Sequence, residues 1–449
     1  MKLWYHCIIL SYNIITQLIR INMTIHIVTS GETLESIAND YGISIEKLMY
    51  DNGITSPTNL VVGQSIVIAL PETTYIIKDG DTLEQIAKNN ELSVIELLAN
   101  NPYLFDEKYL YPGDTIIIKY PKKESITTHG NTVPTINKTT LMKTLPYLTY
   151  LSILNYTATK EGFIKQYYDE TEIVNMAKSY GVAPLMLLTT LTLQGEANIT
   201  TDFHLLLNKE FQKVQIENIL RILKEKGYWG LNISIQYISL SNLSLYEEYF
   251  TNVVNRLNTE GYQVFVTINP NIKFTNNKVE FEKIDYSTIN ELAHNIIFTS
   301  YEWAFNANPP SPITSVYQTK VFLDFILSFI PPDKVIIGIA TLGYDWELPY
   351  VSGISDVNVI SYNNVNNLAK AYNINIQFDE LSQTPYFTYK KNQYEDHAIW
   401  FINAKTIQGI LNLVSEYHLN GISVWNITVY NPQLWLIINS QYIIEKVTL

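Results

Sequence analysis

Apolar and polar residues alternate strictly from Gly230 to Gln236, after a segment with a helical pattern that ends at Gly227. This period of two predicts a β-strand with two distinct faces. The apolar face carries Leu231, Ile233 and Ile235, and the polar face carries Asn232, Ser234 and Gln236. In a half-exposed sheet the polar face would meet water. In a closed barrel it would point inward, with Gln236 at the C-terminal mouth.

Short apolar runs recur beyond residue 144, and amphipathic helical patterns separate most of them. The clearest runs cover 147–156, 183–191, 230–238, 262–270, 295–303, 334–341 and 421–427, and a weaker one lies at 162–165. Buried strands that alternate with helices are typical of a parallel α/β domain. We therefore predict a (βα)8 TIM barrel over 144–449, with a small α+β insertion at about 347–399. A doubly wound sheet is the alternative, but no glycine-rich phosphate loop follows the first strand.

Two internal repeats precede this domain, at 24–70 and 74–120. Ile27–Ala38 aligns with Ile76–Ala87, and Val62–Ile68 aligns with Pro112–Ile118. Each repeat has the pattern of a strand, a glycine turn, two helices and a second strand (βααβ). The segment 121–143 is polar and without periodicity, so we predict a linker there.

The first helix of each repeat is predicted to begin after a threonine. Thr82 is followed three positions later by Gln85, which fits a reciprocal capping box. The matching pair in the first repeat is Thr33 and Ser36. We expect only the single hydroxyl cap of Thr33 at that position.

The two repeats resemble lysin motifs over their whole length. The resemblance implies binding of peptidoglycan or chitin-like glycan through N-acetylglucosamine units, in a groove between the first strand–helix loop and the loop before the last strand. In the first repeat the groove residues would be Gly31, Glu32, Thr33 and Leu34 with Ile54 and Leu60. In the second they would be Gly80, Asp81, Thr82 and Leu83 with Pro102 and Leu110. Two weak sites on a short connector gain affinity for a repetitive polymer; a module kept for spacing or docking is the alternative.

The strand at 230–236 resembles the fourth-strand motif Asp-Gly-x-Asp-x-Asp-x-Glu of family 18 glycoside hydrolases, in the version of spore-cortex-lytic N-acetylglucosaminidases. The framework matches, but the carboxylates do not. Trp229 stands at the first Asp position, and Asn232 stands at the second, where this branch often carries Asn. Ser234 stands at the third Asp position, and Gln236 stands at the position of the general acid.

The resemblance extends over the whole predicted barrel. Leu145–Tyr150 is similar to the first strand of this family. The later segments that resemble it are Ser300–Trp303, Gly343–Tyr350, Gln377–Glu380, Pro385–Phe387, Trp400–Ala404 and Gly421–Trp425. Trp400–Ala404 has lost two further carboxylates of the usual Trp-Phe-Glu-Asp-Ala. The resemblance implies that Tyr301 contacts the substrate acetamido group and that Trp425 forms the floor of the cleavage subsite, with further substrate contacts from Glu302, Trp303 and Tyr344.

Family 18 enzymes use the N-acetyl oxygen of the substrate as the nucleophile. A Glu protonates the leaving oxygen and an Asp orients the acetamide, but Gln236 has no usable proton and Ser234 has no charge. General acid catalysis alone typically contributes about 10²- to 10⁴-fold. We therefore expect a barrel that binds glycan without cutting it efficiently. An active N-acetylglucosaminidase would need another acid, such as Glu196 or Glu302, and a spore-coat scaffold that binds other proteins is a third interpretation.

The composition narrows the range of partners. The formal charge of −13 is spread over short segments, which argues against a nucleic-acid partner held by phosphate contacts. Cys7 is the single cysteine and the histidines are scattered, so we expect neither an intrachain disulfide nor a metal site. No cofactor is implied. We expect a peptidoglycan or chitin-like glycan as the partner, spore-coat proteins as further candidates, and a location in the spore envelope or cell wall of a spore-forming bacterium.

Residues 1–22 form an apolar stretch interrupted by His6, Asn13, Gln17 and Arg20. A signal peptide needs a continuous apolar core, and a transmembrane helix needs about 18 such residues. We therefore expect no cleaved signal peptide and no transmembrane segment, with translation starting at Met23. A membrane-surface anchor and an export signal are the alternatives.

Overall fold

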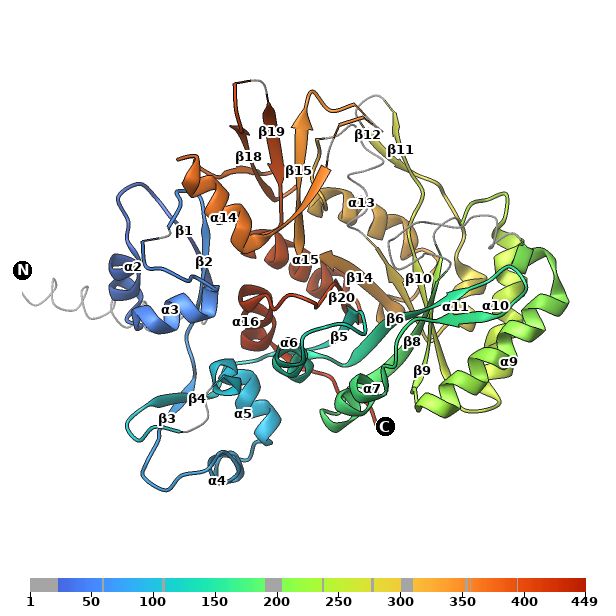
Figure 1. Cartoon of the computed structure of the whole chain (residues 1–449), viewed down its shortest axis with the longest axis horizontal. Coiled ribbons are helices and arrows are strands. Elements are labelled where there is room, and N and C mark those ends of the chain that lie inside the picture. The colour runs from blue at the N-terminus through green and yellow to red at the C-terminus, as the bar shows by residue number, and fades with distance from the viewer. Residues whose placement is uncertain are drawn as a thin grey trace, which may run out of the picture.

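The computed structural model describes residues 23–449 except 59, 107–109, 190–203, 236–237, 276–277, 300–309, 352–353, 356 and 394. Figure 1 shows three parts: two small N-terminal modules, a barrel of strands surrounded by helices, and a sheet with one helix at one end of the barrel. This arrangement confirms the predicted fold class.

Each N-terminal repeat folds as the predicted βααβ module. The first consists of β1 (Met23–Ile27), α2 (Leu34–Tyr41), α3 (Ile45–Asn52) and β2 (Ser65–Ala69). The second consists of β3 (Thr73–Ile76), α4 (Leu83–Asn89), α5 (Val94–Asn100), a 3-10 turn (Pro102–Phe105) and β4 (Thr115–Lys119). The two strands of each repeat pair antiparallel. Leu, Ile and Val side chains from the helices and strands fill each small core.

The helix caps are the reverse of the prediction. Ser36 N donates to Thr33 Oγ1 at 3.1 Å, and Thr33 N donates to Ser36 Oγ at 3.0 Å, which completes a capping box in the first repeat. In the second repeat the cap at Thr82 is the bond from Gln85 N to the hydroxyl at 3.2 Å. The prediction was wrong because a serine hydroxyl at this position reaches the main chain as well as a longer amide does.

Eight parallel strands close into the predicted barrel. They are β5 (Glu124–Thr132), β6 (Tyr150–Ala158), β8 (Ala183–Thr189), β9 (Gly230–Ile235), β10 (Gln263–Ile268), β13 (Asn295–Phe298), β14 (Val335–Ala340) and β20 (Gly421–Trp425). Successive strands pair in parallel. β5 pairs with both β6 and β20, which closes the cylinder.

The first barrel strand lies in the segment that we predicted to be a linker. β5 occupies 124–132, so the barrel begins before residue 144, and the strand predicted to be first is the second. The weak run at 162–165 is also not a barrel strand, because β7 (Ile164–Gln166) pairs antiparallel with β6. The pattern failed at β5 because its sequence is mostly polar although 126–132 is buried on both faces.

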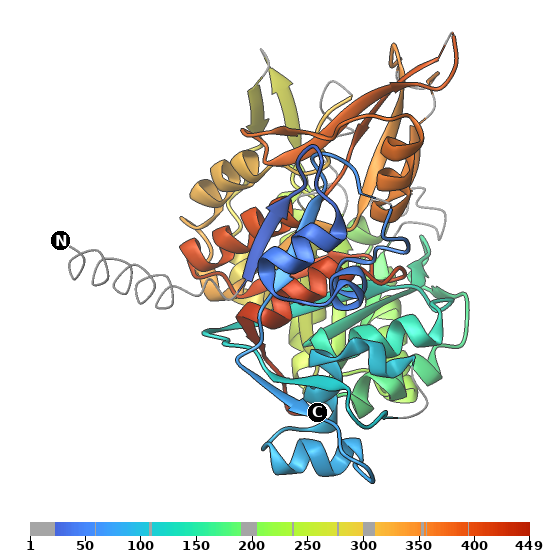
Figure 2. The ribbon, with the colours of Figure 1, turned by 90° about the vertical axis from the view of Figure 1, so that its left-hand side faces the viewer.

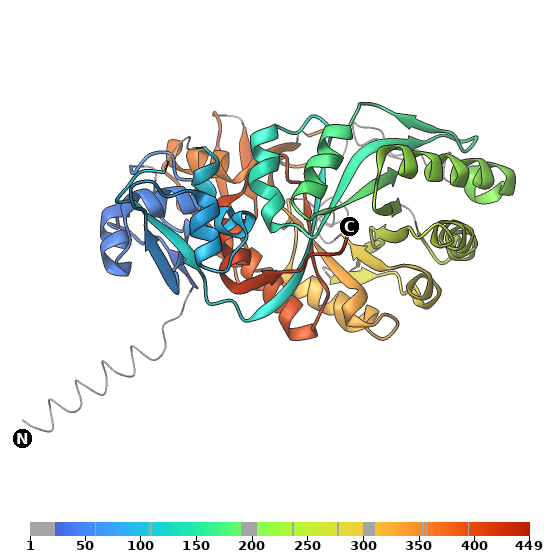
Figure 3. The same cartoon turned by 90° about the horizontal axis from the view of Figure 1, so that it is seen from below.

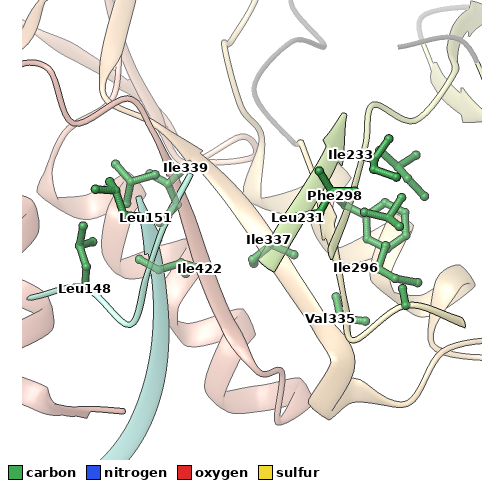
Figure 4. Close-up of a cluster of buried hydrophobic side chains, with 14 of the residues drawn as sticks. Leu148, Leu151, Leu231, Ile233, Ile296, Phe298, Val335, Ile337, Ile339 and Ile422 are labelled. Atoms are coloured by element: carbon green, nitrogen blue, oxygen red, sulfur yellow. The ribbon is translucent and has the colours of Figure 1, made fainter. Parts of the chain in front are cut away.

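Helices cover the outside of the barrel. They are α6 (Lys138–Thr144), α7 (Thr171–Ser179), α9 (Lys209–Lys226), α10 (Leu243–Asn258), α11 (Ser287–Leu292), α13 (Val316–Ile326), α15 (Ala404–Tyr417) and α16 (Pro432–Gln441), with 3-10 turns at Leu145–Tyr147 and Pro332–Lys334. A hairpin of β11 (Ile272–Thr275) and β12 (Lys278–Phe281) follows β10. Apolar strand residues fill the layer between strands and helices, as Figure 4 shows for Leu231, Ile233, Ile296, Phe298 and Val335.

An insertion after β14 forms an antiparallel sheet and one helix. Its strands are β15 (Leu342–Leu348), β16 (Val357–Ser361), β17 (Gln377–Asp379), β18 (Thr384–Lys390) and β19 (Asp396–Trp400), and its helix is α14 (Tyr362–Ala371). The strands lie in the order β16-β15-β19-β18-β17. Val365 and Ala369 of α14 pack on Phe387 and Ile399 of the sheet. The insertion begins a few residues before the predicted boundary.

Both repeats pack on the barrel domain through the helix α16. Gln433 Nε2 donates to Asn52 Oδ1 at 2.9 Å and to Ser65 O at 2.8 Å in the first repeat. Further along α16, Asn439 Nδ2 donates to Asn100 Oδ1 at 2.9 Å in the second repeat. Figure 2 faces this side and shows the first repeat in front of the barrel.

The C-terminal segment covers the N-terminal end of the barrel. β21 (Tyr442–Ile444) pairs in parallel with β5. Val447 and Trp229 pack on the inward-facing residues Tyr150 and Phe265, and Trp229 Nε1 donates to Thr448 O at 3.3 Å. Figure 3, seen from below, shows this segment ending over the strands. Trp229 therefore lies at the end of the barrel opposite the mouth.

Candidate glycan sites

The inward face of β9 is polar. Asn232 is fully buried inside the barrel, and Ser234, one layer nearer the C-terminal mouth, is half-buried. The apolar residues Leu231, Ile233 and Ile235 lie on the outer side, under the helices. Of the two interpretations of this strand, the structure confirms the closed barrel.

A chain of hydrogen bonds crosses the barrel interior at the level of Asn232. Asn232 Nδ2 donates to Ser152 Oγ at 3.1 Å, and Thr267 Oγ1 donates to Asn232 Oδ1 at 2.9 Å. The two ring nitrogens of His129 lie 2.7 Å from Ser152 Oγ and 2.7 Å from Ser423 Oγ. These hydrogen bonds therefore join β20, β5, β6, β9 and β10, and Thr267 at their end is the register partner of Ser234.

His129 is uncharged in this chain at neutral pH. Its side chain is fully buried, and burial lowers its pKa to about 3 because a charged ring would lose its hydration. A neutral imidazole donates from one nitrogen and accepts at the other. Asn131 on the same strand adds bonds from its Nδ2 to Ser423 Oγ at 3.0 Å and to Val424 O at 3.1 Å. These residues offer neutral dipoles to the floor of the barrel mouth.

Two of the predicted substrate contacts lie at the mouth. Trp425 is the last residue of β20 and is half-buried, and Thr341 N donates to its carbonyl oxygen at 3.1 Å. Tyr344 on β15 lies opposite Trp400 on β19. Trp400 stacks on Tyr386 of β18 with ring centroids 4.5 Å apart. Trp400 and Tyr386 thus extend a half-buried aromatic row from Tyr344 across three strands.

Several predicted site residues lie outside the residues that the structure describes. They are Gln236, Tyr301, Glu302 and Trp303, together with the candidate acid Glu196. Their placement stays a prediction, as does the assignment of Ser234 to the position of the assisting Asp. The sequence of β9 and of the two residues after it contains no Asp or Glu.

In each repeat the acidic groove residue shapes its own turn. Glu32 Oε2 accepts from Thr29 N at 2.6 Å, and this main-chain bond lowers the pKa of Glu32. Asp81 Oδ2 accepts from Lys78 N at 2.7 Å and from Tyr75 OH at 3.0 Å. Both carboxylates are therefore already engaged in holding the loop that would face a glycan.

The other predicted groove residues differ in burial. The side chains of Leu34 and Ile54 lie in the core of the first repeat, so they can offer a glycan only their main chain. The residues that are exposed or half-buried are Gly31, Thr33, Leu60, Gly80, Thr82, Leu83, Pro102 and Leu110. Gly31 and Gly80 have φ of +89° and +81° in the turn before the helix, a conformation that favours glycine.

Sequence reasoning missed the interior chain around His129. Its members His129, Ser152 and Ser423 lie on separate strands, and no local spacing connects them. The local sequence contains no signal for this chain, because Thr128 and Gly130, on either side of His129, are not apolar and leave no apolar–polar alternation.

Among the residues that the structure describes, the polar groups of the interior hydrogen-bond chain are hydroxyls, amides and a neutral imidazole, which suit a neutral, hydroxyl-rich ligand. Among the described residues, no group of three or more His, Cys, Asp or Glu side chains could hold a metal ion. In the same part of the chain, no helix has both the length and the apolar character needed to cross a membrane.

Sequence comparison shows the family. The profile of Glycosyl hydrolases family 18 matches residues 155–429, and the profile of the LysM domain matches residues 26–69 and 75–119. The chain therefore belongs to glycosyl hydrolase family 18 and carries two LysM domains, which agree with the two repeats.

The chain is also similar over nearly its full length to particular Bacillus proteins. It is 30% identical to the cortical fragment-lytic enzyme of Bacillus subtilis (strain 168), over 95% of this chain and 100% of that protein. It is 28% identical to the putative sporulation-specific glycosylase YdhD of the same organism, over 92% and 98%. The crystal structure of the spore cortex-lytic enzyme SleL of Bacillus megaterium QM B1551 matches with a TM-score of 0.76 and 28% identity, over 95% of this chain and 100% of that chain.

Proposed function

We propose that this protein binds peptidoglycan of the spore cortex or cell wall through its LysM domains, and that its barrel holds N-acetylglucosamine-containing glycan without cleaving it efficiently. The observation that carries the second part is the inward face of β9. Asn232 and Ser234 lie there. The resemblance aligns Ser234 with the assisting Asp of the family, whereas the branch often carries Asn at the position of Asn232, so Ser234 is the replacement that supports the proposal. The names of the Bacillus relatives support the spore envelope as the location.

The chemistry explains why these replacements matter. In substrate-assisted hydrolysis a positive charge develops on the acetamido group, and a preorganised carboxylate stabilises it. The Ser234 hydroxyl is a neutral dipole, and the described groups below it, Asn232 and His129, are neutral as well. Gln236 in the position of the acid would add no proton. Binding depends on Tyr344, Trp425 and neutral hydrogen-bonding groups, which are retained.

An active N-acetylglucosaminidase is the second candidate. It is favoured by the 30% identity to a cortical fragment-lytic enzyme over the full length of that protein. This reading requires an acid from another position, for which Glu196 and Glu302 are the candidates.

Release of reducing ends from purified cortex fragments tests the two candidates. We expect none from the parent protein, little from Ser234→Asp or Gln236→Glu alone, and measurable release from the double variant. The two groups act on one transition state, so their effects should be strongly non-additive. Parent activity that survives Gln236→Ala would overturn the proposal and support a recruited acid.

Co-sedimentation with cortex peptidoglycan tests the binding part. The full chain should sediment with the polymer, and soluble oligomers of N-acetylglucosamine should release it. Sedimentation only with intact spore coats, and not with purified peptidoglycan, would instead support a scaffold that binds spore-coat proteins.

A further inference from the structure

Both LysM domains hold the loop before their last strand beside the first strand–helix loop by the same main-chain bond. In the first repeat Gly63 N donates to Val28 O at 2.8 Å, and in the second Gly113 N donates to Ile77 O at 2.8 Å. These two loops are the predicted walls of the glycan groove. Since their main chain is alike in the two repeats, a difference between the grooves comes from the side chains and from neighbouring parts of the molecule.

In the first repeat the insertion covers residues 61–65 of this wall. Ile376 N donates to Val62 O at 2.9 Å. Val61 is 6% exposed and lies in the same apolar cluster as Val365 of α14. A glycan therefore cannot reach this part of the wall.

The rest of the same wall offers a sugar little to pack against. The side chain of Ile54 lies in the core of the repeat. The exposed residues that follow it, Thr55, Pro57 and Thr58, are small. Among the described residues of 23–70, no large apolar or aromatic side chain is exposed. Sugar sites combine polar groups with an apolar or aromatic surface for the face of the ring, and this groove lacks that surface.

In the second repeat the equivalent wall is open. Tyr111 is aligned with Val61 and is 54% exposed. Pro112, Asp114 and Thr115 are exposed as well. Figure 1 shows α14 beside the first repeat, whereas the second repeat lies away from the insertion. An exposed tyrosine ring can pack on the apolar C–H face of a sugar ring while its hydroxyl stays in water.

We propose that the tandem repeats attach to glycan through the second LysM domain alone, with Tyr111 as a contact that stacks on a sugar ring. The glycan, which contains N-acetylglucosamine, lies between the loops at 78–83 and 102–114. The matching wall of the first repeat holds the insertion instead and binds no glycan. The two repeats therefore do not act as a bivalent pair. This inference rests on the proposed binding of peptidoglycan through the LysM domains.

Hydrogen exchange of the full chain, measured with and without a saturating tetramer of N-acetylglucosamine, tests each repeat separately. The tetramer should slow exchange at 78–84 and 110–115 and leave it unchanged at 29–35 and 53–65. Slower exchange in the first repeat would overturn the proposal and leave glycan binding by the LysM domains in place.

The variant Tyr111→Ala tests the contact itself. Its affinity for purified peptidoglycan should be about tenfold weaker than that of the parent, because the stacking surface is lost. The control is Tyr317→Ala on α13 of the barrel domain, where the tyrosine is 52% exposed, and it should bind as the parent does. Both variants should keep the parent melting temperature, since both side chains are exposed.

The outcomes separate this inference from the proposed function. Unchanged affinity of Tyr111→Ala would overturn the role of Tyr111 while peptidoglycan binding stands. Should this variant melt lower than the parent, the exchange measurement on the parent decides without it. A parent that binds neither the tetramer nor peptidoglycan would overturn the proposed function itself, and slower exchange in the barrel domain alone would overturn attachment through either LysM domain.

Discussion

The two LysM domains share one fold but meet the barrel domain differently, and a pair of equivalent glycines shows the difference. Gly63 and Gly113 both have positive φ, +88° and +98°. A Cβ at Gly63 would lie 2.1 Å from Ile376 O of the insertion, whereas a Cβ at Gly113 would meet nothing within 4 Å. Gly113 is therefore required by the conformation of its turn alone. Gly63 is required by its turn and also by the close approach of the insertion.

Two equivalent asparagines also differ in their contacts with the barrel domain. Val67 N donates to Asn52 Oδ1 at 2.6 Å, and Ile117 N donates to Asn101 Oδ1 at 2.7 Å. Each side chain thus ties a helix end to the last strand of its own repeat. Asn52 Oδ1 also accepts from Gln433 of α16. The internal bond is common to both repeats, and the docking bond is an addition.

The largest expected difference comes from replacing the two glycines. Gly63→Ala should destabilise the protein by more than about 2 kcal/mol, because the new methyl group collides with main chain and the φ is unfavourable. Gly113→Ala should cost about 1 kcal/mol, from φ alone. Urea unfolding of the two variants measures both values. Equal losses would show that the contact with Ile376 does not distinguish the repeats.

The residues before these asparagines are Asp51 in the first repeat and Asn100 in the second. Replacing each by the residue of the other repeat should change the stability by an intermediate amount. Asn100 Nδ2 donates to Ile118 O at 2.7 Å, so Asn100→Asp loses that bond and brings a carboxylate to a carbonyl oxygen. We expect a loss of about 2 kcal/mol at neutral pH. The loss should shrink in acid, where a protonated carboxyl group can donate again.

The reverse exchange, Asp51→Asn, should stabilise slightly. Burial raises the pKa of Asp51, so the folded state binds the proton more tightly than the unfolded state does. The stability that this proton contributes is present below the ordinary pKa and is lost as pH rises through the raised value. The melting temperature of Asp51→Asn should therefore exceed that of the parent at pH 7 and match it near pH 3. A lower melting temperature at pH 7 would mean that the pair with Lys47, at 2.6 Å, outweighs burial.

The smallest difference should come from the helix caps. Thr33→Ala and Thr82→Ala each remove one hydrogen bond to the threonine hydroxyl, from Ser36 N and from Gln85 N. The bond from Thr33 N to Ser36 Oγ uses the main chain and stays. We therefore expect similar losses of about 1 kcal/mol. Thermal unfolding of the two variants at pH 7 compares them, and a clearly larger loss for Thr33→Ala would show that the two bonds of the capping box depend on each other.

The fold was largely predictable from the sequence because most barrel strands are continuous apolar runs between amphipathic helices. β5 is the exception. Its inward side chains, such as His129 and Asn131, are polar because they bond to other strands, and that satisfaction is invisible in the local sequence. Because β5 was missed, the segment of the hairpin strand β7 was counted as the eighth barrel strand in the prediction.

The candidate site was predictable only in part. The period of two put Asn232 and Ser234 on one face of the strand, and the alternation of strands and helices along the rest of the chain predicted that this face points into a barrel. The hydrogen bonds of His129 to Ser152 and Ser423 join strands that become neighbours only when the barrel closes, so the local sequence could not predict them. In the LysM domains the resemblance predicted which loops form the groove, but it could not show that Leu34 and Ile54 turn their side chains into the core.

The late closure of the barrel affects the protein while it is being made. His129 and its partner Ser423 are 294 positions apart, which corresponds to roughly 15 to 60 s of ribosomal synthesis. The strands of each LysM domain pair within a much shorter stretch, so these domains can fold long before β5 finds its last neighbour. An apolar strand left open for that time would invite aggregation. The polar sequence that makes β5 hard to recognise as a strand should therefore also make its open edge less prone to aggregation than an apolar strand would be, until β20 is made.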